Sequence, residues 1–278
     1  MKPTKLFYAT LFICSGYISK AQTDSSEKQK PQFKFGLNYN SELNYYGRTD
    51  SLKSTGFFPL AEFWFSKDVY VSAAPVFVNN AVKSFDYAGT VATLGYLHVT
   101  DKMVTNLYLT KSFYKESSQL VQSALEAQGG ASLSFLNKIM NFTVGGDMKY
   151  SDKLDFGAIA GLDHIIRKEL AGNIVLVVDP SFYTYAGTQN FTNTYYKKQK
   201  GLSILPGSNQ EVKENVTMFS ILAYEFSLPL IFAKGKWMGL VTPSYILPQN
   251  LVTIPGRPDL SENGRNMFYA NAGVKYSF

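Results

Sequence analysis

Apolar side chains recur at every second position through the last twelve residues of the chain, and from Ala270 onwards polar or small residues stand between them. One parity carries Phe268, Ala270, Ala272, Val274, Tyr276 and Phe278, and the other carries Asn271, Gly273, Lys275 and Ser277. Successive side chains of a β-strand point to opposite faces, so this pattern predicts a strand with one apolar and one polar face. A strand of a soluble β-sandwich has the same pattern, so the other segments must decide between fold classes.

The same alternation recurs along the chain and predicts twelve strands. They are 33–45, 56–66, 69–78, 86–98, 103–115, 129–136, 139–150, 153–166, 173–186, 217–232, 236–247 and 267–278. Tight turns alternate with longer connections between them, and the longer ones are 46–55, 79–85, 116–128, 187–216 and 248–266. Ser151-Asp152 is the exception, because it is a tight turn where the alternation calls for a longer connection. Residues 167–172 count as a tight turn. Because 56–66 and 217–232 alternate poorly, ten or fourteen strands remain as alternatives.

Over residues 33–278 the chain resembles bacterial outer-membrane β-barrel proteins, which have short turns at one end and long loops at the other. The resemblance implies an all-β fold: a transmembrane antiparallel up-and-down β-barrel of about twelve strands, with short periplasmic turns and longer external loops. It also implies that the barrel-assembly machinery recognises the C-terminal signal formed by Val274, Tyr276 and Phe278.

The N-terminal residues predict export. Residues 1–21 are expected to be a cleaved signal peptide, with a charged start, a short apolar core and small residues before Gln22, and 22–32 a short periplasmic lead. Removing residues 1–21 takes away three lysines, so the formal charge falls from +6 to +3, which argues against nucleic-acid binding. It also removes Cys14, the only cysteine, and no cofactor is expected. The end of the signal peptide and Asp50-Ser51-Leu52, which resembles an O-glycosylation acceptor, are similar to sequences from Bacteroidota.

Polar residues on the predicted inward face are candidates for lining the barrel lumen. They are Asn38, Asn40, Glu42, Asn44, Asn141, Asp147, Lys149, Asp155, Asp163, Asp179, Asn271 and Lys275. Small residues on the same face leave space for solvent or for an inserted segment, and they are Gly145, Gly157, Gly161 and Gly273. The aromatic side chains of Trp64, Trp237 and Tyr245 are predicted to form girdles at the membrane interfaces.

An enzyme is not expected. Outer-membrane lipid hydrolases place a serine two residues after a histidine on one strand, and neither His98 nor His164 has that spacing. Two separated histidines without cysteine also provide no clustered metal ligands.

Two functions remain in competition. The leading hypothesis is a passive channel for small polar solutes, and the alternative is a non-conducting barrel subunit or scaffold of a larger outer-membrane assembly. Residues 116–128 are predicted to form a short helix, either on the rim or folded into the mouth. Expected partners are outer-membrane lipid and lipopolysaccharide, the latter near Lys197, Lys198 and Lys200, and a protein partner at the external loops.

Overall fold

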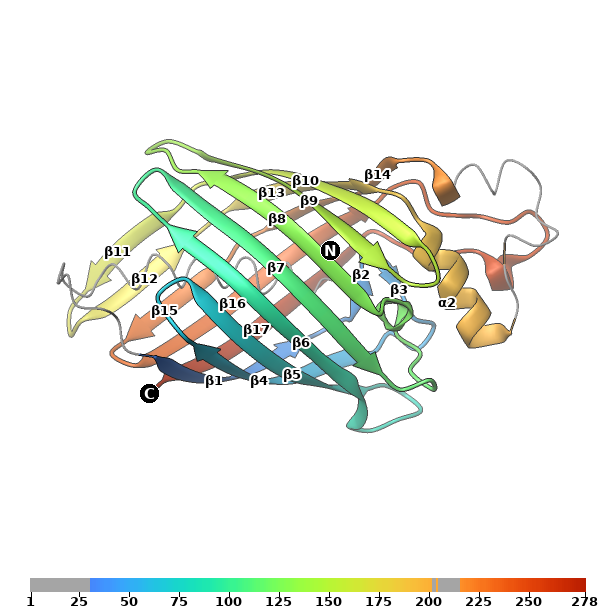
Figure 1. Ribbon diagram of the computed structural model, residues 1–278, viewed down its shortest axis with the longest axis horizontal. Helices are drawn as coiled ribbons and strands as arrows, with labels where there is room; N and C mark the ends of the chain where they lie inside the picture. Colours follow the sequence, from blue (N-terminus) through green and yellow to red (C-terminus); the bar gives the residue numbers. More distant parts are fainter. Residues whose placement is uncertain (1–30, 202–203, 205–215) are drawn as a thin grey trace.

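Twelve antiparallel strands close into a barrel in the computed structural model, which describes residues 31–201, 204 and 216–278 (Figure 1). The predicted signal peptide and nearly all of the predicted lead lie outside the described residues. The ring consists of β1 (Gln32–Asn40), β4 (Thr55–Trp64), β5 (Val69–Asn79), β6 (Asp86–Val99), β7 (Met103–Tyr114), β8 (Ala127–Phe135), β9 (Asn141–Tyr150), β10 (Leu154–Asp163), β13 (Ser181–Gly187), β14 (Ser220–Ser227), β16 (Trp237–Pro248) and β17 (Met267–Ser277). The predicted fold class and strand number are confirmed.

The first and last strands close the ring. β1 and β17 pair antiparallel from Lys34–Ser277 to Asn40–Asn271, and the amide of Phe278 donates to the carbonyl of Phe33 over 2.9 Å. Closure satisfies backbone groups that an open sheet edge would leave unpaired.

The two ends of the barrel differ. The short-turn end has the connections 65–68, 100–102, 136–140, 171–173 and 235–236, and the loop end has the connections 41–54, 80–85, 115–126, 151–153, 188–219 and 249–266. At the short-turn end, three strands continue after a break as β11 (Ile166–Leu170), β12 (Ile174–Val178) and β15 (Leu230–Lys234). Pro180 and Pro229 lie at two of the breaks. Proline has no backbone N–H to donate to a neighbouring strand, so the strand is interrupted there. The predictions of unbroken strands at 173–186 and 217–232, and of a turn beginning at Arg167, are therefore wrong in detail.

The outward face of the barrel is apolar. On β1, Phe33, Phe35, Leu37 and Tyr39 are 37–44% exposed, while the alternate residues Asn38 and Asn40 are buried. Other strands repeat the pattern, with outward-facing Leu107, Leu109, Met148, Leu154, Phe156, Leu162 and Phe232 all exposed. An apolar surface that encircles a barrel is typical of the lipid-facing side of membrane barrels. Within the described ranges, no helix is both long and apolar enough to cross a membrane.

The prediction that Trp64 belongs to an interface girdle is wrong. Its side chain is 6% exposed and lies inside the barrel, where the indole Nε1 donates to Glu62 Oε2 over 3.2 Å. The register of β4 explains this, because Trp64 shares its face with Leu60 and Glu62, which are also buried. Its exposed neighbours are Phe63 and Phe65 instead.

Short elements gather at the loop end. They are the hairpin strands β2 (Asn44–Tyr45) and β3 (Arg48–Thr49), the 3-10 turns η1 (Val121–Ala124) and η2 (Pro258–Leu260), and helix α2 (Asn190–Lys200). Figure 1 draws β2 and β3 within the outline of the barrel, with α2 beside them. The predicted strand 33–45 therefore ends at Asn40. The predicted helix over 116–128 is a single 3-10 turn, and the expected loop 187–216 contains a helix.

Local conformation explains the hairpin and the helix end. Tyr46 and Gly47 both have positive φ angles, 56° and 74°, as a two-residue hairpin turn requires. Helix α2 ends at Gly201 in the left-handed conformation, with Lys197, Lys198 and Lys200 in its last turn. Cations there offset the partial negative charge of the helix C-terminus.

Candidate functional site

The candidate site is the barrel interior together with the elements that fill its mouth. Nine of the twelve predicted lumen residues have side chains buried inside the barrel wall: Asn38, Asn40, Asn141, Asp147, Lys149, Asp163, Asp179, Asn271 and Lys275. The other three lie at the loop end. Glu42 accepts a hydrogen bond from Arg265 over 2.7 Å, Asn44 belongs to the hairpin, and Asp155 contacts α2.

Two pairs of opposite charge are buried in the interior, whereas the buried carboxylate of Glu225 accepts a hydrogen bond from the hydroxyl of Tyr269 over 2.7 Å. The Lys275 ammonium lies 2.7 Å from Glu62 Oε1, and both side chains are buried. Lys149 forms a second buried ion pair with Asp147. Glu62 could not be predicted from the sequence, because apolar residues on both faces break the alternation of its strand. Pairing keeps these charges tolerable where water access is low.

The spaces beside the inward glycines are occupied by other side chains. A Cβ atom at Gly157 would collide with Lys149 and Asp147, one at Gly161 with the ring of Tyr183, and one at Gly273 with Asn38. The expectation of free space at these glycines is therefore wrong. The glycines allow their neighbours to lie flat against the barrel wall.

The mouth is filled by residues 41–49, 120–125 and 189–200, which we call the mouth plug. Tyr45 is fully buried, and its ring packs edge-on against Phe191 of α2 at 4.7 Å between centroids. The ring of Tyr46 lies 5.2 Å from that of Tyr185 on β13. Burial raises the pKa of the Tyr45 phenol above its ordinary value, as expected for a side chain shielded from water.

Apolar contacts of the mouth plug reach both sides of the barrel. One cluster joins Tyr45 and Tyr46 to Val121, Leu125 and Phe191, and to the wall residues Tyr183, Tyr185, Leu222, Ala223, Ile246, Met267 and Tyr269. A second cluster joins Leu43 and Leu120 to the opposite wall residues Phe58, Val76, Val78, Ala88 and Val91. Residues 120–125 thus lie in the mouth, which is one of the two placements left open by the sequence.

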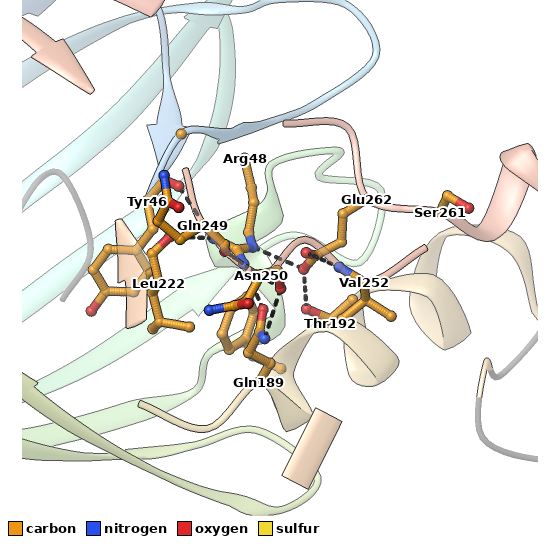
Figure 2. A network of polar contacts seen from close by, with 12 residues as sticks. Tyr46, Arg48, Gln189, Thr192, Leu222, Gln249, Asn250, Val252, Ser261 and Glu262 are labelled. Carbon is orange, nitrogen blue, oxygen red and sulfur yellow. Dashed lines mark hydrogen bonds and ion pairs between the residues drawn. The ribbon is translucent and has the colours of Figure 1, made fainter. Parts of the chain in front are cut away.

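Arg48 fastens the hairpin to the barrel (Figure 2). The guanidinium Nη1 donates to the carbonyls of Tyr46 and Leu222, each over 3.2 Å. Nη2 donates to Gln189 Oε1 over 2.5 Å and to the carbonyl of Gln249 over 3.2 Å. One buried side chain therefore connects the hairpin, strand β14, the start of α2 and the loop after β16.

Glu262 neutralises this buried cation. Its Oε1 lies 2.9 Å from Arg48 Nε, and the two side chains are 4% and 2% exposed. Glu262 also accepts hydrogen bonds from the hydroxyl of Thr192 over 2.5 Å and the amide of Val252 over 2.8 Å (Figure 2). Neither Arg48 nor Glu262 stands in an alternating strand, so the period-two pattern gave no signal for either.

Asp155 fixes the start of α2. Its carboxylate accepts hydrogen bonds from the amides of Asn190 and Phe191, at 2.7 and 2.8 Å, and from the hydroxyl of Thr188 at 2.6 Å. A carboxylate that receives the first amides of a helix acts as its N-terminal cap. Asp155 is thus a support of the mouth plug.

The two histidines lie near the short-turn end. His98 Nδ1 is 3.2 Å from Asp68 Oδ1, and the amide of His164 donates to the carbonyl of Pro180. Among the described residues, no three His, Cys, Asp or Glu side chains are grouped to hold a metal ion.

Aromatic rings from three strands meet at the short-turn end. Trp237 is 57% exposed, and its ring lies 4.8 Å from Tyr276. The rings of Tyr276 and Phe278 are 4.9 Å apart, and Phe278 also contacts Phe33 at 5.5 Å. Tyr245, near the other end of β16, is exposed on the same outward face.

Comparisons with known proteins add the following. No protein-family model matches the sequence, and no curated protein has significant similarity to it. Among solved structures, it is similar to the KdgM porin (TM-score 0.49, 8% identity, covering 88% of this chain and 99% of that one). It is also similar to an outer membrane channel from Pseudomonas putida F1 (0.45, 10%, 92% and 100%) and to LpxR from Salmonella typhimurium (0.42, 10%, 87% and 99%). With identities of 8–10% and TM-scores below 0.5, these similarities do not indicate a function.

Proposed function

We propose that this chain is a bacterial outer-membrane β-barrel protein whose interior is a path for small polar solutes, closed in this conformation by the mouth plug. The closed ring of twelve strands and its apolar outward face support the membrane location. The exposed Trp237 and Tyr276 at the short-turn end fit the headgroup level of a bilayer.

The observation that carries the solute path is the set of polar side chains on the inward face below the mouth plug, which lie beside apolar clusters around Leu97 and Leu240 near the short-turn end. Amides, hydroxyls and paired charges lie there, among them Asn38, Asn271 and the Lys275–Glu62 pair. A barrel that required only a filled core would gain more from apolar side chains, because buried ion pairs contribute little net stability. Passage would require the hairpin β2–β3 to leave the mouth. The proposal includes no catalytic step and no cofactor.

Conductance in planar bilayers tests this proposal. Wild-type protein should be silent or open only briefly, whereas a variant with residues 44–49 replaced by a short Gly-Ser linker should give stepwise currents. The same linker in place of residues 81–84, in a loop outside the mouth plug, is the matched control and should behave like wild type. A hairpin variant that stays silent, although heat-modifiable gel mobility shows it folded, would contradict the solute path.

A second candidate is a non-conducting barrel that serves as a subunit of a larger envelope assembly. The observation that favours it is the extensive contact between the mouth plug and the barrel. Two apolar clusters and the buried Arg48–Glu262 pair hold the mouth plug against both walls. Pull-down in mild detergent from the native membrane discriminates between the two. A stoichiometric set of partner proteins favours the subunit, and an isolated barrel favours the solute path.

A further inference from the structure

A cavity of about 490 Å³ lies at the loop end between the rim of β7, residues 123–126 and helix α2. Its size is in the range of ligand sites in proteins. Three ammonium groups line it, from Lys111, Lys197 and Lys198, together with the carboxylates of Glu126 and Asp152. The cavity therefore has an excess of positive charge.

Weak contacts hold the three ammonium groups. Lys111 lies 3.5 Å from Glu126, and both side chains are half exposed or more. Lys197 pairs with Asp152 at 2.9 Å, again on the surface. Among the residues that the structure describes, Lys198 donates to the backbone carbonyls of Lys115 and Ser123, at 3.4 and 3.3 Å. Because exposed ion pairs contribute little, an anion of higher charge could replace these contacts at small cost.

The apolar belt of the barrel runs directly into this cavity. Lys111 stands in the outward row of β7 between Leu109 and Phe113, which are 60% and 57% exposed. A lysine at that place lays its methylenes along the apolar surface and carries its charge to the headgroup level. Phe113 lines the cavity as well. A ligand there would meet apolar surface on the barrel side and cations and hydroxyls on the loop side.

We propose that this cavity binds the phosphorylated sugar headgroup of an acylated glycolipid in the outer leaflet. The three lysines contact its phosphate, Glu126, Asp152 and the hydroxyl of Thr194 face its sugar hydroxyls, and its acyl chains lie along the outward row of β7. This inference rests on the proposed outer-membrane location. It does not depend on whether the barrel conducts.

Native mass spectrometry of the purified, folded protein tests the site, with bis-phosphorylated lipid A as the probe. Wild type should bind one molecule, and the variant Lys111→Gln/Lys198→Gln should bind it about tenfold or more weakly, since each lysine near an anionic headgroup contributes about 1 kcal/mol. The control Lys53→Gln removes an exposed lysine from another external loop and should leave binding unchanged. Lipid A without phosphates should bind wild type as weakly as the intact lipid binds the double variant.

Three results would overturn the proposal. They are equal binding of the dephosphorylated lipid, equal losses in the double variant and in Lys53→Gln, and displacement of lipid A by millimolar glucosamine 1-phosphate, which has no acyl chains. Heat-modifiable mobility of each variant shows that the barrel is folded. A folded, inserted barrel that fails to retain lipid A refutes this site alone and leaves the proposed location intact.

Discussion

Replacing Arg48 by alanine is expected to release the hairpin β2–β3 from the mouth while the barrel stays closed. Removing one partner of a buried ion pair costs about 3–5 kcal/mol, because the remaining charge stays buried. Glu262 keeps two other donors, from Thr192 and Val252, so the loss should lie near the lower limit, about 3 kcal/mol. Since 1.4 kcal/mol is a factor of ten, the opening equilibrium of the hairpin should rise about a hundredfold.

Amide hydrogen exchange measures this change directly. The amides of Leu43 and Thr49 donate to the carbonyls of Ser54 and Asn263 over 2.7 and 2.8 Å, so their protection should fall about a hundredfold when the hairpin opens. Amides of β1 and β17 should keep theirs. Arg265→Ala is the matched control, because the Arg265 side chain is 50% exposed and its pair with Glu42 contributes at most about 1 kcal/mol. Unchanged protection at Leu43 and Thr49, or an equal fall throughout the barrel, would refute the role given to Arg48.

Three further changes test other parts of the structure. Asp155→Ala removes the cap of α2 and should lower the local stability of its first turn by about 1–2 kcal/mol, which exchange at the Asn190 and Phe191 amides would report. Val144→Arg, on the outward face, should lower the free energy of unfolding by about 2–4 kcal/mol, measured with urea in lipid vesicles. Val82→Arg, in an exposed loop, should leave it almost unchanged. Similar losses in the two variants would contradict the lipid-facing assignment. Deleting Phe278 removes about 1.5–3 kcal/mol of stabilisation from apolar burial. The control is Phe268→Ala, which removes an exposed aromatic side chain from the same strand. A much larger insertion defect without Phe278 would indicate recognition by the assembly machinery, and equal defects would argue against it.

Period-two alternation predicted the barrel wall well. A strand with one apolar face shows the same repeat wherever it lies in the ring, so β1, β9, β10 and β17 could be located within a few residues. The alternation fails on β4, where Phe58, Leu60 and Trp64 face inward beside Glu62. Apolar side chains on both faces removed the signal there. As a result, the sequence wrongly predicts an interface position for Trp64, which lies in the interior.

The mouth plug could not be predicted, because its residues are brought together by the closure of the ring. Arg48 and Glu262 are 214 positions apart and meet only when the first and last loops lie at one end of the barrel. Helix α2 has a polar sequence, and its position depends on Asp155 from a different strand. Gly47 was the local signal available, since glycine takes a positive φ angle at no steric cost and often marks a turn.

The most direct test of a solute path closed by the mouth plug is a thiol-block measurement in planar bilayers. The chain has a single cysteine, Cys14, within the predicted signal peptide, so one new cysteine can be placed in the variant with the Gly-Ser linker at 44–49. At Ser132, on the inward face of β8, a charged methanethiosulfonate reagent should reduce the current in steps. At Leu133, whose side chain points outward, the same reagent should have no effect. Currents that respond equally at both positions, or at neither, would contradict a solute path through the barrel interior.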